Sequence, residues 1–369
     1  MRPEAIRSVQ EQSMWRYLAL LPVDDPGHLS TPLRSVGWTP IYSSSRLKRD
    51  IGLENLWIKD ESPNPTASFK DRASALLVAR GAEIGAETIV TASTGNAGAA
   101  LAGMAAAVGT QAVIFAPESA PSAKIAQLMI YGAQVFLVDG NYDEAVQLSR
   151  LAADEFGWYC RNTAYNPFTV EGKKTAAFEI WEQLLDQETL SEKLCIFVSV
   201  GDGNIISGMH KGFQDLVALG WLQASPRIFG VQAEGSAAIA KAFDAQNEQI
   251  APVIADTLAD SISVNLPSDG LRALRAATQT DGAYVTVRDE QIIQAIPALG
   301  SVGIFTEPAG AAAFAGAQAA LESGMIKSSD PTLVIATGSG LKDVSAAQDS
   351  VDKPSVIKPT MQALKEALK

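Results

Sequence analysis

Residues 88–117 read TIVTASTGNAGAALAGMAAAVGTQAVIFAP and contain no charged side chain. β-Branched residues open and close this stretch and alanines fill its middle, which predicts a strand at 88–92, a helix at 97–108 and a strand at 112–116. Its length would also allow a membrane-spanning helix, but glycines, an asparagine and a glutamine interrupt it. We therefore expect a strand–helix–strand unit buried in a sheet, and no membrane partner.

The same alternation of short β-branched runs and alanine-rich stretches continues along the chain. Further strands are expected at 135–138, 195–200, 228–232, 284–287 and 333–336, and further helices at 122–131, 142–156, 205–219, 236–245, 289–299 and 307–323. Strands that alternate with helices and are apolar on both faces form parallel sheets covered on each side. A more polar region near 186–193 separates two such series. The sequence therefore predicts an α/β protein with two doubly wound, mostly parallel sheet domains.

The composition of the chain limits its partners and its chemistry. It has 369 residues, enough for about two domains, and its 29 Lys and Arg against 41 Asp and Glu leave a net charge of −12. An acidic chain repels phosphate backbones, so we expect no nucleic-acid partner. The two histidines are far apart, and Cys160 and Cys195 lie in apolar runs. This pattern predicts neither a metal site nor a disulfide framework, and it indicates a cytoplasmic protein.

One lysine stands at an unusual place in the predicted secondary structure. In the segment 64–72, which reads NPTASFKDR, prolines break the preceding structure and a helix is expected to start near Lys70. A cation at a helix N-terminus is unfavourable, because the helix dipole already places positive charge there. Lys70 is therefore either an ordinary surface lysine or a lysine of lowered pKa that serves as an imine-forming amine.

Three glycine-containing turns follow predicted strands, where backbone N–H groups converge on ligands in parallel sheets. The turn at 93–96 offers hydroxyls and an amide, which suit a carboxylate, although an ordinary turn would look the same. The turn at 201–205 suits a phosphate; it lacks the third glycine of a dinucleotide-binding loop and the Lys-Ser/Thr ending of a P-loop. After the last predicted strand, the segment 336–343 (ATGSGLKD) places polar hydroxyls at a strand end, and such a hydroxyl can bind a ring nitrogen of a heterocycle. A lysine, a phosphate loop, an amide and a hydroxyl are what pyridoxal 5′-phosphate requires.

The string NPTASFKDRA at 64–73 resembles the cofactor-lysine motif of fold-type-II pyridoxal-phosphate enzymes, in particular threonine synthases and their near relatives. Other motifs of that family follow in its order: GWTP at 37–40, STGN at 93–96, NPFTVEGKKTAAFE at 166–179, VGDGN at 200–204, EPAGA at 307–311 and TGSGLKD at 337–343. The resemblance covers nearly the whole chain and implies the fold of the tryptophan synthase β subunit. It also implies a larger cofactor-binding domain, residues 1–90 and 176–369, and a smaller mobile substrate domain, residues 91–175.

The resemblance assigns roles to the candidate residues. Lys70 would carry the cofactor and later move protons, Asn96 would bind its ring oxygen, and Thr337 would face its pyridine nitrogen. The residues that would cradle the cofactor phosphate are Gly201, Asp202, Gly203, Asn204 and Ile205, and those that would bind the substrate carboxylate are Ser93, Thr94 and Gly95.

The activity implied by the resemblance is that of a threonine synthase-type lyase, a homodimer that converts the amino acid O-phosphohomoserine and water to threonine and phosphate. The sequence departs from the family pattern at two positions. Thr169 stands where threonine synthases commonly have an arginine that binds the substrate phosphate, and Ala97 where they often have a hydroxyl residue. Both changes remove anion donors; Lys173 or Lys174 could supply a replacement.

Other functions remain open at the level of the sequence. The departures at Thr169 and Ala97 leave a threonine or serine dehydratase (an ammonia-lyase), or a β-replacement enzyme acting on a phosphorylated or sulfonated amino acid, as alternatives. A non-enzymatic binding protein of the same fold is a further class, but the presence of Lys70 together with both cofactor loops argues against it.

Overall fold

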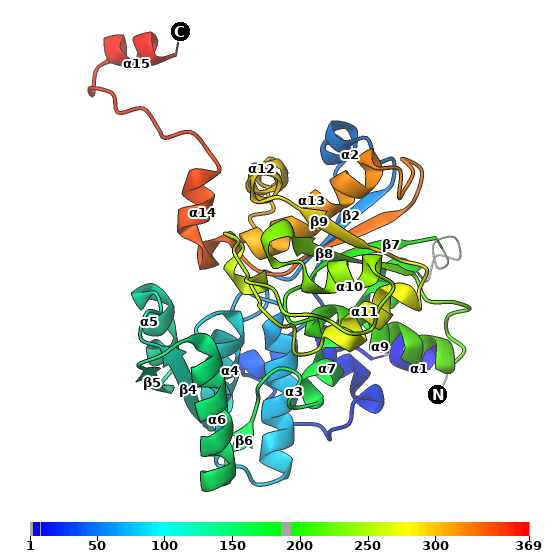
Figure 1. Ribbon diagram of the computed structural model, residues 1–369, viewed down its shortest axis with the longest axis vertical. Helices are drawn as coiled ribbons and strands as arrows, with labels where there is room; N and C mark the ends of the chain where they lie inside the picture. The colour runs from blue at the N-terminus through cyan, green and yellow to red at the C-terminus, as the bar shows by residue number, and fades with distance from the viewer. Residues whose placement is uncertain (1–2, 8, 186–192, 369) are drawn as a thin grey trace.

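The computed structural model describes residues 3–7, 9–185 and 193–368. Within these residues the strands form two sheets, of order β1-β2-β10-β7-β8-β9 and β5-β4-β3-β6 (Figure 1). All pairings are parallel except that of β1 with β2. The prediction of two mostly parallel α/β sheets is therefore confirmed. Most of the polar region expected near 186–193 lies outside the described residues.

The four-stranded sheet is formed by the segment of the chain that begins with residue 88. Its strands are β3 (Thr88–Ala92), β4 (Gln111–Pro117), β5 (Gln134–Val138) and β6 (Tyr159–Cys160), and its helices are α4 (Asn96–Val108), α5 (Ser122–Ile130) and α6 (Tyr142–Phe156). Local chemistry accounts for the helix ends: Gly109 ends α4 with a φ of +79°, and Asn141 and Glu144 form a capping box that begins α6.

The six-stranded sheet combines the first part of the chain with its second half. Its strands are β1 (Ile41–Tyr42), β2 (Leu56–Asp60), β7 (Cys195–Ser199), β8 (Arg227–Ala233), β9 (Tyr284–Val287) and β10 (Thr332–Ala336). The remaining α-helices of the described residues are α1 (Pro3–Arg7), α2 (Ser45–Ile51), α3 (Lys70–Glu83), α7 (Phe168–Lys173), α8 (Thr175–Ile180), α9 (Asn204–Ala218), α10 (Ala238–Asp244), α11 (Gly270–Thr278), α12 (Asp289–Gly300), α13 (Pro308–Glu322), α14 (Val344–Asp349) and α15 (Met361–Ala367).

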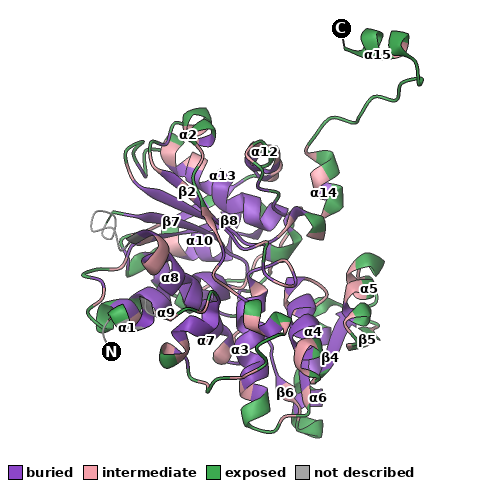
Figure 2. Ribbon diagram, turned by 180° about the vertical axis from the view of Figure 1, so that it is seen from behind, coloured by how far each residue is buried: buried purple, intermediate pink, exposed green. Residues whose placement is uncertain are grey.

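Helices cover both faces of the larger sheet because successive strand residues point to opposite sides. Ile196 and Val198 of β7 pack with α8, α9 and α11, whereas Phe197 packs with α12 and α13. Figure 2 shows the buried residues concentrated in these strands and in the helices that face them. Each sheet is therefore doubly wound, as predicted.

Helix α3 connects the two sheets. Its apolar residues Leu76, Leu77 and Val78 share a buried cluster with Ile89 of β3 and Leu101 of α4, so most of the helix packs on the smaller sheet. Its first residue, however, lies at the carboxyl end of β10 in the larger sheet, because the N–H of Phe69 donates to the carbonyl of Thr337 at 2.8 Å. This arrangement brings the lysine at the start of α3 to the junction of the two sheets.

The C-terminal segment has a different character from the rest of the chain. After α14 the chain runs away from the body to α15, whose residues are mostly exposed (Figures 1 and 2). None of the helices in the described ranges has the length and apolar character needed to cross a membrane.

Candidate active site

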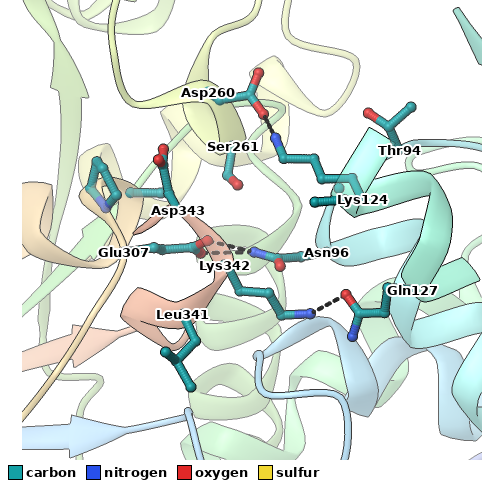
Figure 3. Close-up of a pocket in the computed structure, with 14 residues that line it drawn as sticks. Thr94, Asn96, Lys124, Gln127, Asp260, Ser261, Glu307, Leu341, Lys342 and Asp343 are labelled. Carbon is teal, nitrogen blue, oxygen red and sulfur yellow. Dashed lines mark hydrogen bonds and ion pairs between the residues drawn. The ribbon is translucent and has the colours of Figure 1, made fainter. Parts of the chain in front are cut away.

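Two adjoining cavities lie where the carboxyl ends of the two sheets meet. The first, which we call the Lys70 cavity, is lined by Lys70, Thr163, Lys173, Ser199, Gly201, Asp202, Gly203, Asn204, Ile205, Ser261, Ile262, Glu307, Ala309 and Thr337. The second, the Asn96 cavity (Figure 3), is lined by Thr94, Gly95, Asn96, Ala123, Lys124, Gln127, Asp260, Ser261, Glu307, Pro308, Ala309, Leu341, Lys342 and Asp343. Because Ser261, Glu307 and Ala309 line both, the two cavities belong to one site.

Lys70 is the first residue of α3 and faces the Lys70 cavity. Its surroundings are rigid, since Ser68 bridges to Gly338 and Phe69 donates to Thr337, both just beyond β10. Burial lowers the pKa of Lys70 from its ordinary value, although the carboxylate of Glu307 opposes the shift. The structure thus excludes an ordinary surface lysine and places an amine of lowered pKa in the cavity.

The loop 201–205 has a backbone shape that only glycine allows at two positions. Gly203 has a φ of +89°, and a Cβ there would lie 2.6 Å from the Cβ of Ala273. A Cβ on Gly201 would lie 2.8 Å from the Cα of Ile262. The loop leads directly into the fifteen-residue helix α9, whose first N–H groups have no partner within the helix. Such a helix start with small residues before it binds phosphate groups.

A basic side chain, Lys173, lies against this loop. It is fully buried, and its Nζ donates to Oδ1 of Asn204, whose Nδ2 donates to Oδ2 of Asp269 at 2.6 Å. Burial lowers the pKa of Lys173 well below its ordinary value, and the nearby charges of Lys70 and Arg161 lower it further. Three basic side chains, Lys70, Lys173 and Arg161, therefore lie close together around the Lys70 cavity, and a bound anion would favour their charged forms.

Asn96 and Glu307 meet between the two sheets. Nδ2 of Asn96, the first residue of α4, donates to both carboxylate oxygens of Glu307 at 2.8 and 3.1 Å (Figure 3). Burial raises the pKa of Glu307, while Asn96 and then Lys70 lower it. Glu307 was not predicted to belong to the site. The sequence does contain a signal, the EPAGA motif that Glu307 begins, but it does not show that Glu307 lies beside Asn96.

The predicted carboxylate-binding residues are placed differently from one another. Thr94 and Gly95 line the Asn96 cavity, whereas Ser93 is not among the residues that line either cavity, and its N–H donates to the carbonyl of Phe115 at 3.2 Å. Thr337, which was predicted to face the pyridine nitrogen of the cofactor, is buried and lines the Lys70 cavity.

The residues of the Lys70 cavity fit pyridoxal phosphate. Lys70 provides the amine that the cofactor's aldehyde requires, and the glycine-shaped loop at the start of α9, with Lys173 beside it, provides donors for its phosphate. In addition, Thr337 supplies a hydroxyl in the lining of the Lys70 cavity, and Asn96 supplies an amide in the lining of the adjoining Asn96 cavity.

Comparison with known proteins also indicates pyridoxal phosphate as the cofactor. Residues 33–338 match the family described as pyridoxal-phosphate dependent enzyme. The chain is 38% identical to the threonine synthase of Methanocaldococcus jannaschii, over 98% of this chain and 88% of that protein, and 36% identical to the threonine synthase of Methanosarcina acetivorans, over 96% and 86%.

Solved structures share the fold. Threonine deaminase isoform 2 of Solanum lycopersicum, in its processed form, superposes with a TM-score of 0.74 at 24% identity and covers 92% of both chains. Maize serine racemase gives a TM-score of 0.70 at 23% identity, over 84% of this chain and 91% of that one. At these identities the likeness concerns the fold alone. With a family match over most of its length and a lysine, a phosphate loop and an amide arranged around one cavity, the chain belongs to the pyridoxal-phosphate dependent enzyme family.

Proposed function

We propose that this protein is a threonine synthase, which converts O-phosphohomoserine and water to threonine and phosphate. The observation that carries the proposal is its near full-length similarity to curated threonine synthases. The three basic side chains around the Lys70 cavity support it, since both the cofactor and this substrate carry a phosphate.

The chemistry divides between the cofactor and the chain. Bound pyridoxal phosphate supplies an electron-withdrawing ring that stabilises negative charge on substrate carbon. Lys70 would hold the cofactor and, through its Nζ, remove the proton from the substrate Cα and later return it; burial lowers its pKa, which favours the neutral amine that this proton transfer needs. Lys173 and the loop 201–205 hold the cofactor phosphate.

The remaining residues orient the reactants. Thr94 and Gly95, which line the Asn96 cavity, would bind the substrate carboxylate through the turn that begins α4, and Ser93, whose N–H is bonded to Phe115, would contribute its hydroxyl. Asn96 would donate to the cofactor's ring oxygen, and its contact with Glu307 would keep the amide in place. The hydroxyl of Thr337 would lie beside the pyridine nitrogen of the cofactor, and because it carries no charge it would leave that nitrogen less protonated than a carboxylate would.

The experiment that tests the proposal is a substrate panel. Release of phosphate and threonine from O-phosphohomoserine is the expected result. Formation of ammonia and a 2-oxo acid from threonine or serine, without turnover of O-phosphohomoserine, would assign the protein to the dehydratases instead, a function suggested by the fold shared with threonine deaminase.

Replacement of the lysine tests the cofactor assignment separately. Lys70→Ala should abolish the visible absorbance band of the bound cofactor and reduce turnover by several orders of magnitude, because no other amine occupies the start of α3. The matched control is Lys174→Ala, whose ammonium pairs with Glu171 and Asp215 away from the cavity. An unchanged absorbance band in Lys70→Ala would refute the role of Lys70.

We also propose that residues 91–175 form a mobile substrate domain and that residues 1–90 and 176–369 form the cofactor-binding domain. Two contacts across the Asn96 cavity support this division: Lys124 of α5 pairs with Asp260, and Nζ of Lys342 donates to Oε1 of Gln127 at 3.2 Å (Figure 3). Both join polar side chains at the surface, so they can break and re-form as the cavity opens and closes.

Finally, we propose a cytoplasmic homodimer. The two free cysteines, Cys160 and Cys195, are buried and unpaired, which suits a reducing compartment. The C-terminal segment exposes apolar side chains, among them Val356, Met361 and Leu368, that association could cover. Sedimentation equilibrium of the full chain tests the dimer; a monomeric mass across the micromolar range would refute it.

A further inference from the structure

A buried arginine beside the Lys70 cavity has no assigned role. Arg161 directly follows β6 and is fully buried, yet its Nη2 has no hydrogen-bond partner. Its Nε and Nη1 meet hydroxyls, Oγ of Ser74 and Oγ1 of Thr163, each at 3.3 Å. None of the ion pairs among the described residues includes it.

A buried guanidinium without a carboxylate is costly, because the protein replaces its hydration with weaker neutral partners. The burial lowers the pKa of Arg161 to about 10. The contrast with Arg72 is informative: that arginine is equally buried but is paired with Glu61 and Glu179. An unpaired buried cation beside an active-site cavity therefore points to an anionic ligand that arrives with the substrate.

The position of the guanidinium relative to Lys70 is set by α3. Lys70 and Ser74 are four residues apart on this helix, so their side chains lie on the same face, one turn from each other. Arg161 contacts Ser74, and its second contact, Thr163, lines the cavity that holds Lys70. The charge of Arg161 is also close enough to lower the pKa of both Lys70 and Lys173.

The other anions of the proposed reaction already have binding groups. The cofactor phosphate has the loop 201–205 with Lys173, and the substrate carboxylate has the turn 93–96. Position 169, however, offers no binding group for the phosphate of the substrate, because the hydroxyl of Thr169 is buried and donates to the carbonyl of Asn166 at 2.8 Å.

Lys174, one of the two lysines considered as a replacement, is also occupied. Its Nζ pairs with Glu171 and with Asp215 at 3.0 Å. Lys173, the other, lies against Asn204 of the phosphate loop.

We propose that Arg161 binds the phosphate of the substrate. It would do so from the end of β6, in place of the arginine that threonine synthases commonly have at position 169. The free Nη2 and the adjoining Nη1 present the two parallel N–H groups that grip a phosphate. The proposal rests on the threonine synthase function and names the residue that makes its site selective for a phosphorylated substrate.

Binding to the holoenzyme tests this role without turnover. The probes are 2-amino-5-phosphonopentanoate, a phosphonate that cannot lose phosphate, and norvaline, the same carbon chain without the phosphonate; calorimetry gives both dissociation constants. Arg161→Gln should weaken phosphonate binding at least about 30-fold, as expected when one member of a buried charge pair is removed. Norvaline binding should change less than about threefold. Lys174→Gln, the matched control, should leave both constants unchanged, because Lys211 still pairs with Glu171 and Asp215.

The possible outcomes separate this proposal from the proposed function. If wild type prefers the phosphonate and releases phosphate from O-phosphohomoserine, but Arg161→Gln retains the preference, the role of Arg161 is refuted and the function stands. An equal loss of affinity for the phosphonate and for norvaline in Arg161→Gln also refutes it, because the substitution would then have damaged the site as a whole. If wild type itself shows neither phosphonate preference nor phosphate release, the function fails first.

A second variant guards against a purely structural effect. Arg161→Met removes the unpaired charge but keeps the apolar stem, so the thermal midpoint of the ligand-free holoenzyme should not fall. A fall of many degrees would assign Arg161 to the fold and overturn the proposal.

Discussion

At the scale of single residues, the candidate site contains positions at which only one residue type has the required side-chain chemistry or backbone conformation. Lys70 is such a position because of its amine, and Gly203 because of its backbone. Both stand in short stretches of unusual sequence, and for that reason the sequence alone predicts them. Arg161 belongs to the opposite case, since nothing in CRNTAY marks it as unpaired.

Gly203 offers a test of the phosphate loop. Gly203→Ala should weaken cofactor binding at least about tenfold, because the new Cβ would lie 2.6 Å from Ala273 at a φ of +89° and the loop would have to shift. Titration of the cofactor-free protein with pyridoxal phosphate measures this.

Gly220→Ala is the matched control. Gly220 also has a positive φ, +71°, but a Cβ there would meet nothing within 4 Å. Equal loss of cofactor affinity in both variants would mean that backbone strain alone, and not the shape of the loop, is responsible.

At the scale of elements, a buried ionic network fixes the start of α3. Arg72, two residues after Lys70, bonds Glu61 after β2 and Glu179 of α8, and Lys59 of β2 pairs with Glu179 at 2.9 Å. All four side chains are fully buried. The network therefore ties together the three elements that position the lysine.

Glu179→Gln should lower the free energy of unfolding by about 3–5 kcal/mol, because it leaves Arg72 and Lys59 with one carboxylate fewer in a buried site. Urea denaturation at pH 7 measures the change. Glu248→Gln, which removes a partner of Arg275 at the exposed surface, should leave the urea midpoint unchanged. A Glu179→Gln protein as stable as wild type would show that the network contributes little.

The same carboxylate predicts a pH dependence. Arg72 and then Lys59 outweigh the effect of burial and lower the pKa of Glu179 to about 2. The folded protein thus binds this proton less tightly than the unfolded chain, so the stabilisation is complete above about pH 4.5 and is lost as the pH falls toward 2.

The free energy of unfolding should therefore fall less between pH 5 and pH 3 in Glu179→Gln than in wild type. Asp71, whose pKa burial raises to about 6, acts in the opposite direction, but it is present in both proteins and cancels in the comparison. Parallel pH profiles for the two proteins would exclude the assignment to Glu179.

At the scale of the whole molecule, the active site is a junction between two sheets, and the closure proposed above would involve contacts across the Asn96 cavity. Lys124→Ala removes the ion pair with Asp260 and should raise KM for O-phosphohomoserine by up to about fivefold, the range of a partly exposed pair. Cofactor affinity should not change.

The difference between Lys124→Ala and wild type should shrink as salt rises, because exposed charges are screened. Arg46→Ala serves as control, since its partner Asp50 lies on the same helix α2 and the pair does not cross the cavity. An unchanged KM in Lys124→Ala, or an equal change in Arg46→Ala, would rule out a role for this contact in closure.

The sequence by itself determined the alternation of strands and helices, the glycine turns at 93–96 and 201–205 and the candidate lysine, because each depends on periodicity or on residues close together in the chain. Among the elements it left unpredicted are β1, β2, α2, α7, α8 and α11. Tertiary structure alone decided that Asn96 meets Glu307, 211 residues away, and that Arg161 meets Ser74, 87 residues away. The physical reason is that such pairings depend on how two separately formed sheets pack against one shared helix, which no local pattern encodes.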